Sequence, residues 1–226
     1  MDDKTTMETT KTRLLQAALP HVPFDGWSEA TLTAAITDSQ TAPALARALF
    51  PRGGLDLALA YHAAGDQQLR ETIAATDMAA LRFRDRFATA VRLRLQLADR
   101  ECVRRGTALF ALPQNAAAGT RALWSTADTI WTALGDTSND LSWYTKRVSA
   151  SGVYAATVLF WLGDDSTDQR ATWEFLDRRI ENVMRFEATK THFRENRFGQ
   201  AVMSGPLKIL ERIRAPKRAT DLPGKV

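Results

Sequence analysis

The chain has 226 residues, of which 45% are apolar and 25% charged, so it is long enough to bury a sizeable core and too apolar to be disordered or fibrous. Its longest nearly continuous apolar run, residues 153–162, is about half of the roughly 20 residues that cross a bilayer, so no membrane span is expected. The single cysteine, Cys102, excludes an internal disulfide and is predicted to be a small buried core side chain. The net charge is +4, but residues 178–218 hold eleven Lys or Arg against four Glu, which concentrates positive charge near the C-terminus.

Helix-forming residues dominate the chain, and β-branched residues rarely alternate with polar ones. The sequence therefore predicts an all-α protein. Gly and Pro separate the expected helices, as in the Pro-Arg-Gly-Gly run at residues 51–54. The expected helices cover residues 10–19, 28–37, 42–49, 55–75, 78–105, 116–134, 141–162, 169–190 and 206–214.

Two helix starts carry capping signals. Asn139 or Asp140 is expected to cap the helix over residues 141–162, and residues 166–169 have the spacing of a capping box. The helix over residues 141–162 is apolar on one continuous stripe and on a second face that includes Trp143 and Trp161. We expect it to be covered on two sides, either as a central core helix or as one that borders a cavity or a partner.

The sequence lacks the groupings that carry most chemistry. His21, His62 and His192 lie in separate elements, and none is in a Glu-x-x-His or His-x-x-x-His pairing, so no metal site is expected. Neither a nucleophile elbow nor a phosphate-binding glycine loop occurs. We therefore expect no catalytic residue, no cofactor and no enzymatic activity.

Near the N-terminus, residues 14–19, 27–36 and 44–51 resemble, in their spacing, the three N-terminal helices of TetR-type regulators. Reading DNA requires cations and hydrogen-bond donors on the recognition helix, yet residues 41–49 offer only Arg47. We expect a helix-turn-helix-like scaffold that binds no nucleic acid. A TetR-like transcriptional regulator with a small-molecule effector pocket is the alternative function.

Three runs further along carry a stronger resemblance: Asp-Leu-Ser-Trp-Tyr-Thr-Lys-Arg at residues 140–147, Val-Tyr-Ala-Ala-Thr at 153–157, and Thr-Trp-Glu-Phe-Leu-Asp-Arg-Arg-Ile at 172–180. Together they resemble the TetR-fold lipid-binding accessory proteins of coenzyme Q (ubiquinone) biosynthesis, found in mitochondria and alphaproteobacteria. The resemblance spans roughly residues 14–214. It implies a TetR-like bundle of about nine or ten helices, with an N-terminal helix-turn-helix-like part and a C-terminal amphipathic helix.

The expected domains follow from this resemblance. Residues 1–9 form a disordered tail, and residues 10–52 the helix-turn-helix-like part. Residues 53–204 form the lipid-binding and dimerisation bundle, and residues 205–226 an amphipathic, membrane-contacting helix with a tail.

The resemblance implies a non-catalytic homodimer that binds an isoprenoid quinone intermediate and presents it to the di-iron demethoxyubiquinone hydroxylase at the membrane. The chain start lacks a secretory or transit pattern. The expected location is therefore cytoplasmic, peripheral at the inner face of a bacterial membrane, or the mitochondrial matrix side if a presequence has been removed.

The resemblance also assigns a surface for the hydroxylase, which maps onto Asp140, Trp143 and Tyr144, with Arg147 one turn further on. Trp, Tyr and Arg concentrate binding energy in interfaces because each offers a large area and a polar group. The alternative is that Trp143 and Tyr144 are ordinary core aromatics at a helix start.

Membrane contact is predicted for an amphipathic stretch whose apolar face is flanked by cations that favour anionic lipid head groups. Its residues are Leu207, Lys208, Ile209, Leu210, Arg212, Ile213 and Arg214. The alternative is a helix docked on its own domain with a solvated basic face.

For the lipid pocket, the sequence offers only aromatic residues of expected helices, each of which fills a core by default. The candidates are Trp124, Trp131, Tyr154, Phe160, Trp161 and Phe175.

Overall fold

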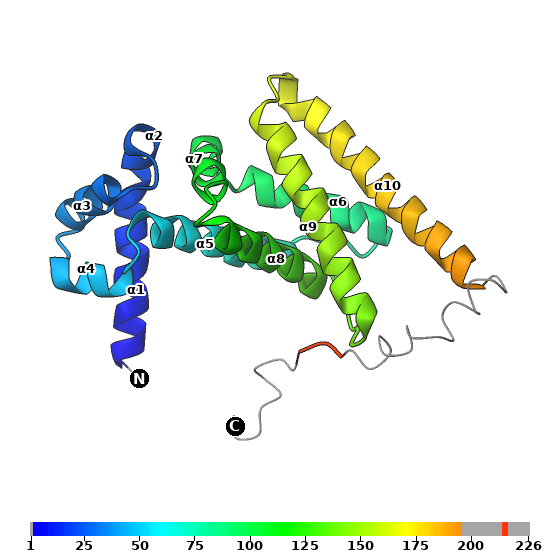
Figure 1. The fold of residues 1–226 in the computed structure, drawn as a ribbon, viewed down its shortest axis with the longest axis horizontal. Helices are drawn as coiled ribbons and strands as arrows, with labels where there is room; N and C mark the ends of the chain where they lie inside the picture. Colours follow the sequence, from blue (N-terminus) through cyan, green and yellow to red (C-terminus); the bar gives the residue numbers. More distant parts are fainter. Residues whose placement is uncertain (1, 196–213, 217–226) are drawn as a thin grey trace. The chain divides into compact units, whose positions relative to one another are not determined.

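A computed structural model describes residues 2–195 and 214–216 (Figure 1). That part of the chain forms helices and connecting turns without a strand, which confirms the all-α prediction. No helix in it combines the length and the apolar character needed to cross a bilayer. The helices are α1 (Asp2–Ala18), α2 (Val22–Asp25), α3 (Glu29–Asp38), α4 (Pro43–Leu49), α5 (Gly54–Ala75), α6 (Phe83–Gln96), α7 (Arg100–Phe110), α8 (Ala116–Ala133), α9 (Leu141–Leu162) and α10 (Arg170–Glu195).

Two expected boundaries differ from the structure. Helix α1 begins at Asp2, so residues 2–9, expected to be a disordered tail, are helical. The single helix expected over residues 78–105 is instead α6 and α7. They separate because the side chain of Asp99 accepts a hydrogen bond from the backbone N–H of Cys102 at 2.8 Å and so caps a new helix.

The chain divides into two compact units. The first combines residues 1–77 and 90–126, and the second combines residues 78–89 with the described residues from Ala127 onward. This division differs from the expected boundary after residue 52, because helices on both sides of that residue share one core. Leu14 of α1, Leu32 of α3 and Leu57 of α5 belong to the same fully buried cluster.

The core of the first unit also includes α7. Trp27 donates a hydrogen bond from Nε1 to the carbonyl oxygen of Cys102 at 3.0 Å. Cys102 is buried, as predicted, and burial raises the pKa of its thiol to about 12. Gly54 begins α5 against the backbone of Trp27, where an added Cβ would lie 2.3 Å from the carbonyl of Trp27. Only glycine permits so close an approach.

A buried polar network joins three helices of the first unit. Asp66 of α5 accepts hydrogen bonds from Arg94 Nε of α6 at 2.9 Å and from Thr126 Oγ1 of α8 at 2.8 Å. His62 Nε2 lies 2.7 Å from the same Thr126 oxygen, and Arg94 donates to the carbonyl of His62 at 3.1 Å. Burial lowers the pKa of His62, so its ring favours the neutral form.

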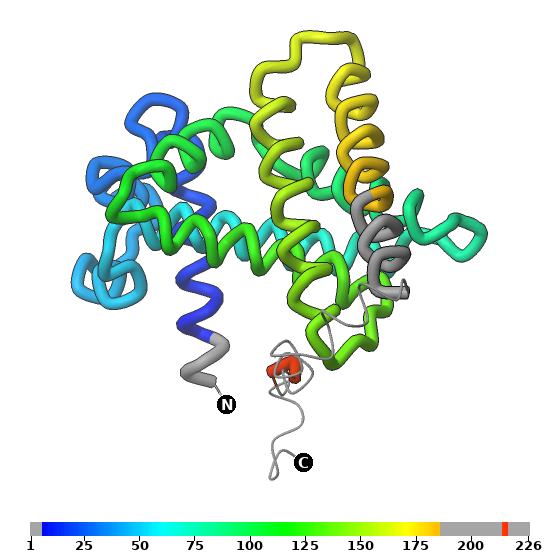
Figure 2. Tube along the Cα trace, turned by 45° about the vertical axis from the view of Figure 1, so that its right-hand side comes forward, coloured from blue at the N-terminus to red at the C-terminus, as the bar shows by residue number. Residues whose placement is uncertain are grey.

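In the second unit, α9 and α10 lie side by side, joined by a short turn (Figures 1 and 2). Asp140 caps α9, as predicted, by accepting a hydrogen bond from the N–H of Ser142 at 2.9 Å. Only half of the capping box expected at residues 166–169 is formed: Ser166 Oγ accepts a hydrogen bond from the N–H of Ala171 at 3.0 Å, but Gln169 caps no backbone amide. Gln169 instead accepts a hydrogen bond from Trp161 Nε1 at 2.9 Å, while Asp164 accepts one from the N–H of Thr172 near the start of α10.

Candidate functional site

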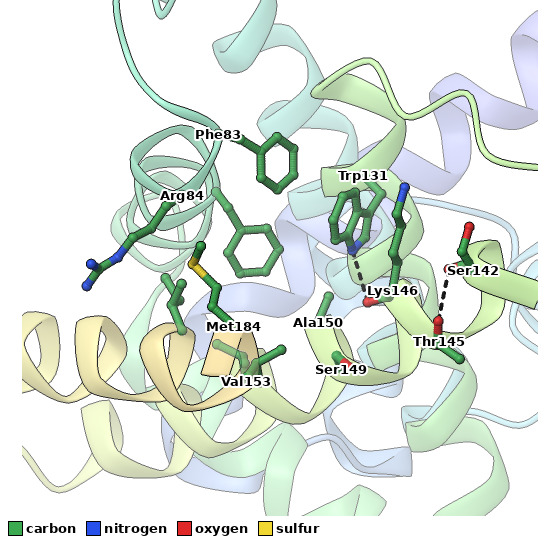
Figure 3. Close-up of a pocket in the computed structure, with 13 residues that line it drawn as sticks. Phe83, Arg84, Trp131, Ser142, Thr145, Lys146, Ser149, Ala150, Val153 and Met184 are labelled. Atoms are coloured by element: carbon green, nitrogen blue, oxygen red, sulfur yellow. Dashed lines mark hydrogen bonds between the residues drawn. The ribbon is translucent and has the colours of Figure 1, made fainter. Parts of the chain in front are cut away.

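The second unit contains a cavity of about 380 Å³. Helices α6, α8, α9 and α10 each contribute side chains to its wall (Figure 3). Most of the wall is aromatic or aliphatic, and these residues are Phe83, Phe87, Trp131, Ala150, Val153, Ile180, Val183 and Met184. The polar part of the wall consists of Arg84, Ser142, Thr145, Lys146 and Ser149.

Aromatic rings form one side of the cavity. Phe83 stacks on Trp131 with ring centroids 5.0 Å apart, and Phe87 lies 6.0 Å from Trp131 at an angle of 47°. Trp131 Nε1 donates a hydrogen bond to the carbonyl of Lys146 at 3.0 Å, which satisfies its only polar group and fixes α8 against α9. With this N–H group bonded, the faces of the aromatic rings that border the cavity offer it only apolar surface.

Of the six aromatic residues proposed for the pocket, Trp131 lines the cavity. Tyr154 and Trp161 are buried elsewhere, at 4% and 3% exposure. Phe160 stacks on Phe175 with centroids 4.5 Å apart, and both lie outside the cavity wall, as does Trp124 of α8. These five predictions of pocket residues are not supported by the cavity.

Sequence reasoning missed Phe83 and Phe87, which precede the family-like runs and fell, unremarked, within the helix expected over residues 78–105. It also missed Val153 and Ile180, although both lie in the runs that carry the resemblance. The second apolar face of α9 predicted that the helix borders a core, a cavity or a partner, but its residues Trp143 and Trp161 lie outside the cavity wall. Periodicity alone does not say which of the three it is.

The candidate partner surface lies at the start of α9. Asp140 is exposed, while Trp143 and Tyr144 are half-buried and meet edge to face with centroids 4.8 Å apart. Hydrogen bonds from Ser142 lower the pKa of Asp140. Tyr144 Oη donates to the carbonyl of Arg214 at 3.2 Å. A segment close to the C-terminus therefore contacts the surface proposed for a partner.

Arg147, which was also assigned to this surface, has no exposed side-chain area. Its guanidinium pairs with Asp128 at 2.6 Å and with Asp136 at 3.0 Å, and it lies 3.9 Å from the ring centroid of Trp143. It also donates to the carbonyl of Trp143. The guanidinium of Arg147 therefore packs against the Trp143 ring, and no part of the Arg147 side chain is exposed to a partner.

Asp136 is the buried centre of this ion-pair network. Burial alone would raise its pKa, but hydrogen bonds from Lys146, Ser138 and Arg147 outweigh that effect and lower it from 3.8 to about 2. Asp136 is therefore a carboxylate at neutral pH. Its charge balances the neighbouring cations, Lys146 at 2.8 Å and Arg147 at 3.0 Å.

Most of the predicted membrane-binding stretch, from Leu207 to Ile213, lies outside the described residues. Its last member, Arg214, is described and exposed. The next residue, Ala215, donates its backbone N–H to the carbonyl of Asn139 at 2.9 Å. The prediction of membrane contact stays a prediction.

In the helix-turn-helix-like part, Arg47 of α4 forms an ion pair with Glu29 of α3 at 2.7 Å. Helix α4 is described in full and carries no other basic side chain. A cation already matched with a carboxylate offers less to a phosphate, and several phosphate contacts are needed for DNA affinity.

Comparisons with known proteins find relatives along most of the chain. The COQ9 family model matches residues 116–187, which contain α8, α9 and much of α10. The mitochondrial ubiquinone biosynthesis protein COQ9 of Xenopus tropicalis is 32% identical over 208 residues, covering 88% of this chain and 64% of the relative. The COQ9 protein of Rattus norvegicus is 30% identical, and the match covers 90% of this chain and 67% of the relative. The COQ9 protein of Homo sapiens is 29% identical, and the match covers 90% of this chain and 66% of the relative. The chain thus spans about two thirds of these relatives.

Proposed function

The chain belongs to the COQ9 family of ubiquinone biosynthesis proteins, and we propose that it binds an isoprenoid quinone intermediate in the cavity of the second unit. In this proposal it catalyses no reaction itself and presents the bound lipid to the demethoxyubiquinone hydroxylase. The observation that carries the proposal is the cavity, whose wall is mostly aromatic and aliphatic.

The size and chemistry of the cavity support a lipid ligand. Its volume of about 380 Å³ lies in the range of roughly 300–1,000 Å³ that is typical of small-molecule sites. If each non-hydrogen atom occupies about as much space as a water molecule, roughly 30 Å³, it holds on the order of a dozen atoms. That is enough for a ring with a short part of a polyprenyl chain. Each methylene moved from water into this environment gains about 0.8 kcal/mol.

The remaining parts of the proposal concern where the protein acts. The curated relatives are named as mitochondrial, which supports action at the matrix side of a membrane or, in a bacterium, at the cytoplasmic side. The basic, amphipathic stretch near the C-terminus would provide peripheral membrane contact. Asp140, Trp143 and Tyr144 would meet the hydroxylase, and we further propose that the protein acts as a homodimer.

Filling the cavity tests the function. Ala150 lines the cavity at 3% exposure, so Ala150→Phe should place a ring in the space that the lipid would occupy. We expect isoprenoid lipid, extracted from purified protein and measured by mass spectrometry, to fall at least fivefold. The matched control is Val148→Phe, because Val148 lies on the same helix at 61% exposure and outside the cavity wall.

The control variant should carry as much lipid as the unchanged protein. Both variants should keep their helical circular dichroism spectrum. Absence of isoprenoid lipid from the unchanged protein, or its full retention in Ala150→Phe, would contradict the proposed function.

A further inference from the structure

A short segment near the C-terminus, residues 214–216, lies across the first turn of α9. Ala215 donates its backbone N–H to the carbonyl oxygen of Asn139 at 2.9 Å, and Tyr144 Oη donates to the carbonyl oxygen of Arg214 at 3.2 Å. Figures 1 and 2 show this segment as the short red stretch beside the end of α9 where that helix begins. We call this segment the strap.

One peptide group of the strap makes both contacts. The N–H of Ala215 and the carbonyl of Arg214 belong to the peptide bond that joins these two residues, and they point in opposite directions across a trans peptide. The sequence favours this arrangement, because Pro216 restricts the residue before it to extended conformations. An extended strap has no intrahelical partners for these two backbone groups, so both are available to α9.

The strap and the surface proposed for the partner protein overlap. That surface consists of Asp140, Trp143 and Tyr144, and the strap contacts the residue just before it, Asn139, and its last member, Tyr144. The hydroxyl is the only side-chain donor of Tyr144, and it donates to the strap. A partner that accepts a hydrogen bond from Tyr144 would therefore have to displace Arg214.

The strap is held loosely enough to leave. Arg214 and Pro216 are exposed, and Ala215 is only partly buried. Hydrogen bonds at the surface add little net stability, because water competes for both groups. Segments with few buried contacts open at a small cost in free energy. The strap can therefore leave α9 while the helices stay folded.

We propose that the strap is an autoinhibitory contact: in the free protein it covers part of the surface formed by Asp140, Trp143 and Tyr144, and a partner protein binds there only after the strap has left. This inference rests on the proposed function, because it assumes that this surface receives the hydroxylase. The affinity for the hydroxylase is then reduced to the fraction of molecules in which the surface is open. Binding of the hydroxylase in turn releases the strap, because such coupling is reciprocal.

Hydrogen exchange at the amide of Ala215, followed by mass spectrometry, measures how often the strap is docked, because a bonded N–H is protected from solvent. Tyr144→Phe removes the hydroxyl that donates to Arg214 and keeps the ring. In the full chain it should raise the exchange rate of this amide about threefold, the effect of one lost surface hydrogen bond. The matched control is Tyr61→Phe, which removes a tyrosine hydroxyl in the first unit and should leave the rate unchanged.

Competition is tested with the hydroxylase itself. Ala215→Pro removes the N–H that bonds to Asn139 and leaves the side chains of the partner surface unchanged. The full chain with this substitution should bind the hydroxylase about threefold more tightly in isothermal titration calorimetry, because more molecules have the surface open. Ala215→Ser keeps the N–H donor and should bind as the unchanged protein does.

A further measurement distinguishes competition from joint binding. Saturating the unchanged protein with hydroxylase should raise the exchange rate at the amide of Ala215, because a displaced strap is open to solvent. A lower rate would mean that the strap and the hydroxylase bind together, and it would overturn the proposal.

The outcomes also separate the inference from the function on which it rests. Unchanged exchange in Tyr144→Phe, or no gain of affinity in Ala215→Pro, would overturn the autoinhibitory contact and leave the partner surface standing. If neither the unchanged protein nor Ala215→Pro binds the hydroxylase, the proposed partner surface and the inference both fail, while the lipid site in the cavity is unaffected.

Discussion

The two units bury the same kinds of side chain but fill their interiors differently. In the first unit, Leu14, Leu57 and Val91 have no exposed surface. In the second, Val153 and Ile180 are nearly as buried, at 6% and 5%, yet they border a cavity of about 380 Å³. A hollow of about 310 Å³ in the first unit has charged residues in its wall, including Lys11 and the paired Arg52 and Asp56.

This difference teaches that burial and packing are separate properties. A side chain can be screened from water and still lack neighbours on one side, where it forfeits dispersion contacts. That loss leaves apolar surface uncovered by protein, so the second unit gives up some stability where it keeps a cavity. The following predictions test this contrast, beginning with the largest change in stability.

A matched pair of valine truncations, one in each unit, should lower the free energy of unfolding by different amounts. Val91→Ala in the first unit should lower the free energy of unfolding by about 2–3 kcal/mol, because it removes two buried methyl groups and opens a new void. Val153→Ala should cost about 1 kcal/mol, because its side chain already borders empty space. Urea denaturation measures both, and equal losses would mean that Val153 is packed as tightly as Val91.

The two buried polar networks should respond to different pH ranges. The pKa of Asp136 falls from 3.8 in the unfolded chain to about 2 in the folded one, so its contribution of about 2 kcal/mol is present above pH 4 and is lost as the pH falls through 2. The pKa of His62 is also lowered, so below its unfolded value of 6.5 the unfolded chain binds a proton that the folded chain does not. The free energy of unfolding therefore begins to fall below pH 6.5, because of His62 in the first unit.

Thermal melts from pH 7.5 down to about pH 1.5 check this order. His62→Gln should flatten the decline just below pH 6.5, and Asp136→Asn should leave that part of the profile unchanged. An unaltered decline in His62→Gln would show that another group is responsible.

Changing Trp143 should affect stability least while removing partner binding. Trp143→Lys should abolish co-purification of the hydroxylase and cost only about 1 kcal/mol, because the half-buried ring mainly covers the guanidinium of Arg147 at 3.9 Å. Val148→Lys, on an exposed part of the same helix, is the control and should retain the partner. A large fall in melting temperature for Trp143→Lys would support the alternative that Trp143 is a core residue.

Local signals predicted much of the architecture and part of the site. The cap at Asp140 and the helix that follows it could be predicted because capping depends on neighbouring residues. Arg147 shows the limit of such reasoning. It was expected beside Trp143 on a surface, but Asp128 and Asp136 pair with it and no side-chain area remains exposed. Helical spacing places residues on a face, and only packing decides whether that face is open.

The sequence by itself determined the all-α fold, the places of most helices and the resemblance to a ubiquinone biosynthesis family, because these depend on short-range patterns along the chain. Tertiary structure alone decided that Phe83, Phe87 and Val153 border a cavity while Tyr154 and Trp161 fill a core. The physical reason is that a cavity is space left between helices. Its position depends on how far apart packed helices lie, a quantity that no single segment encodes.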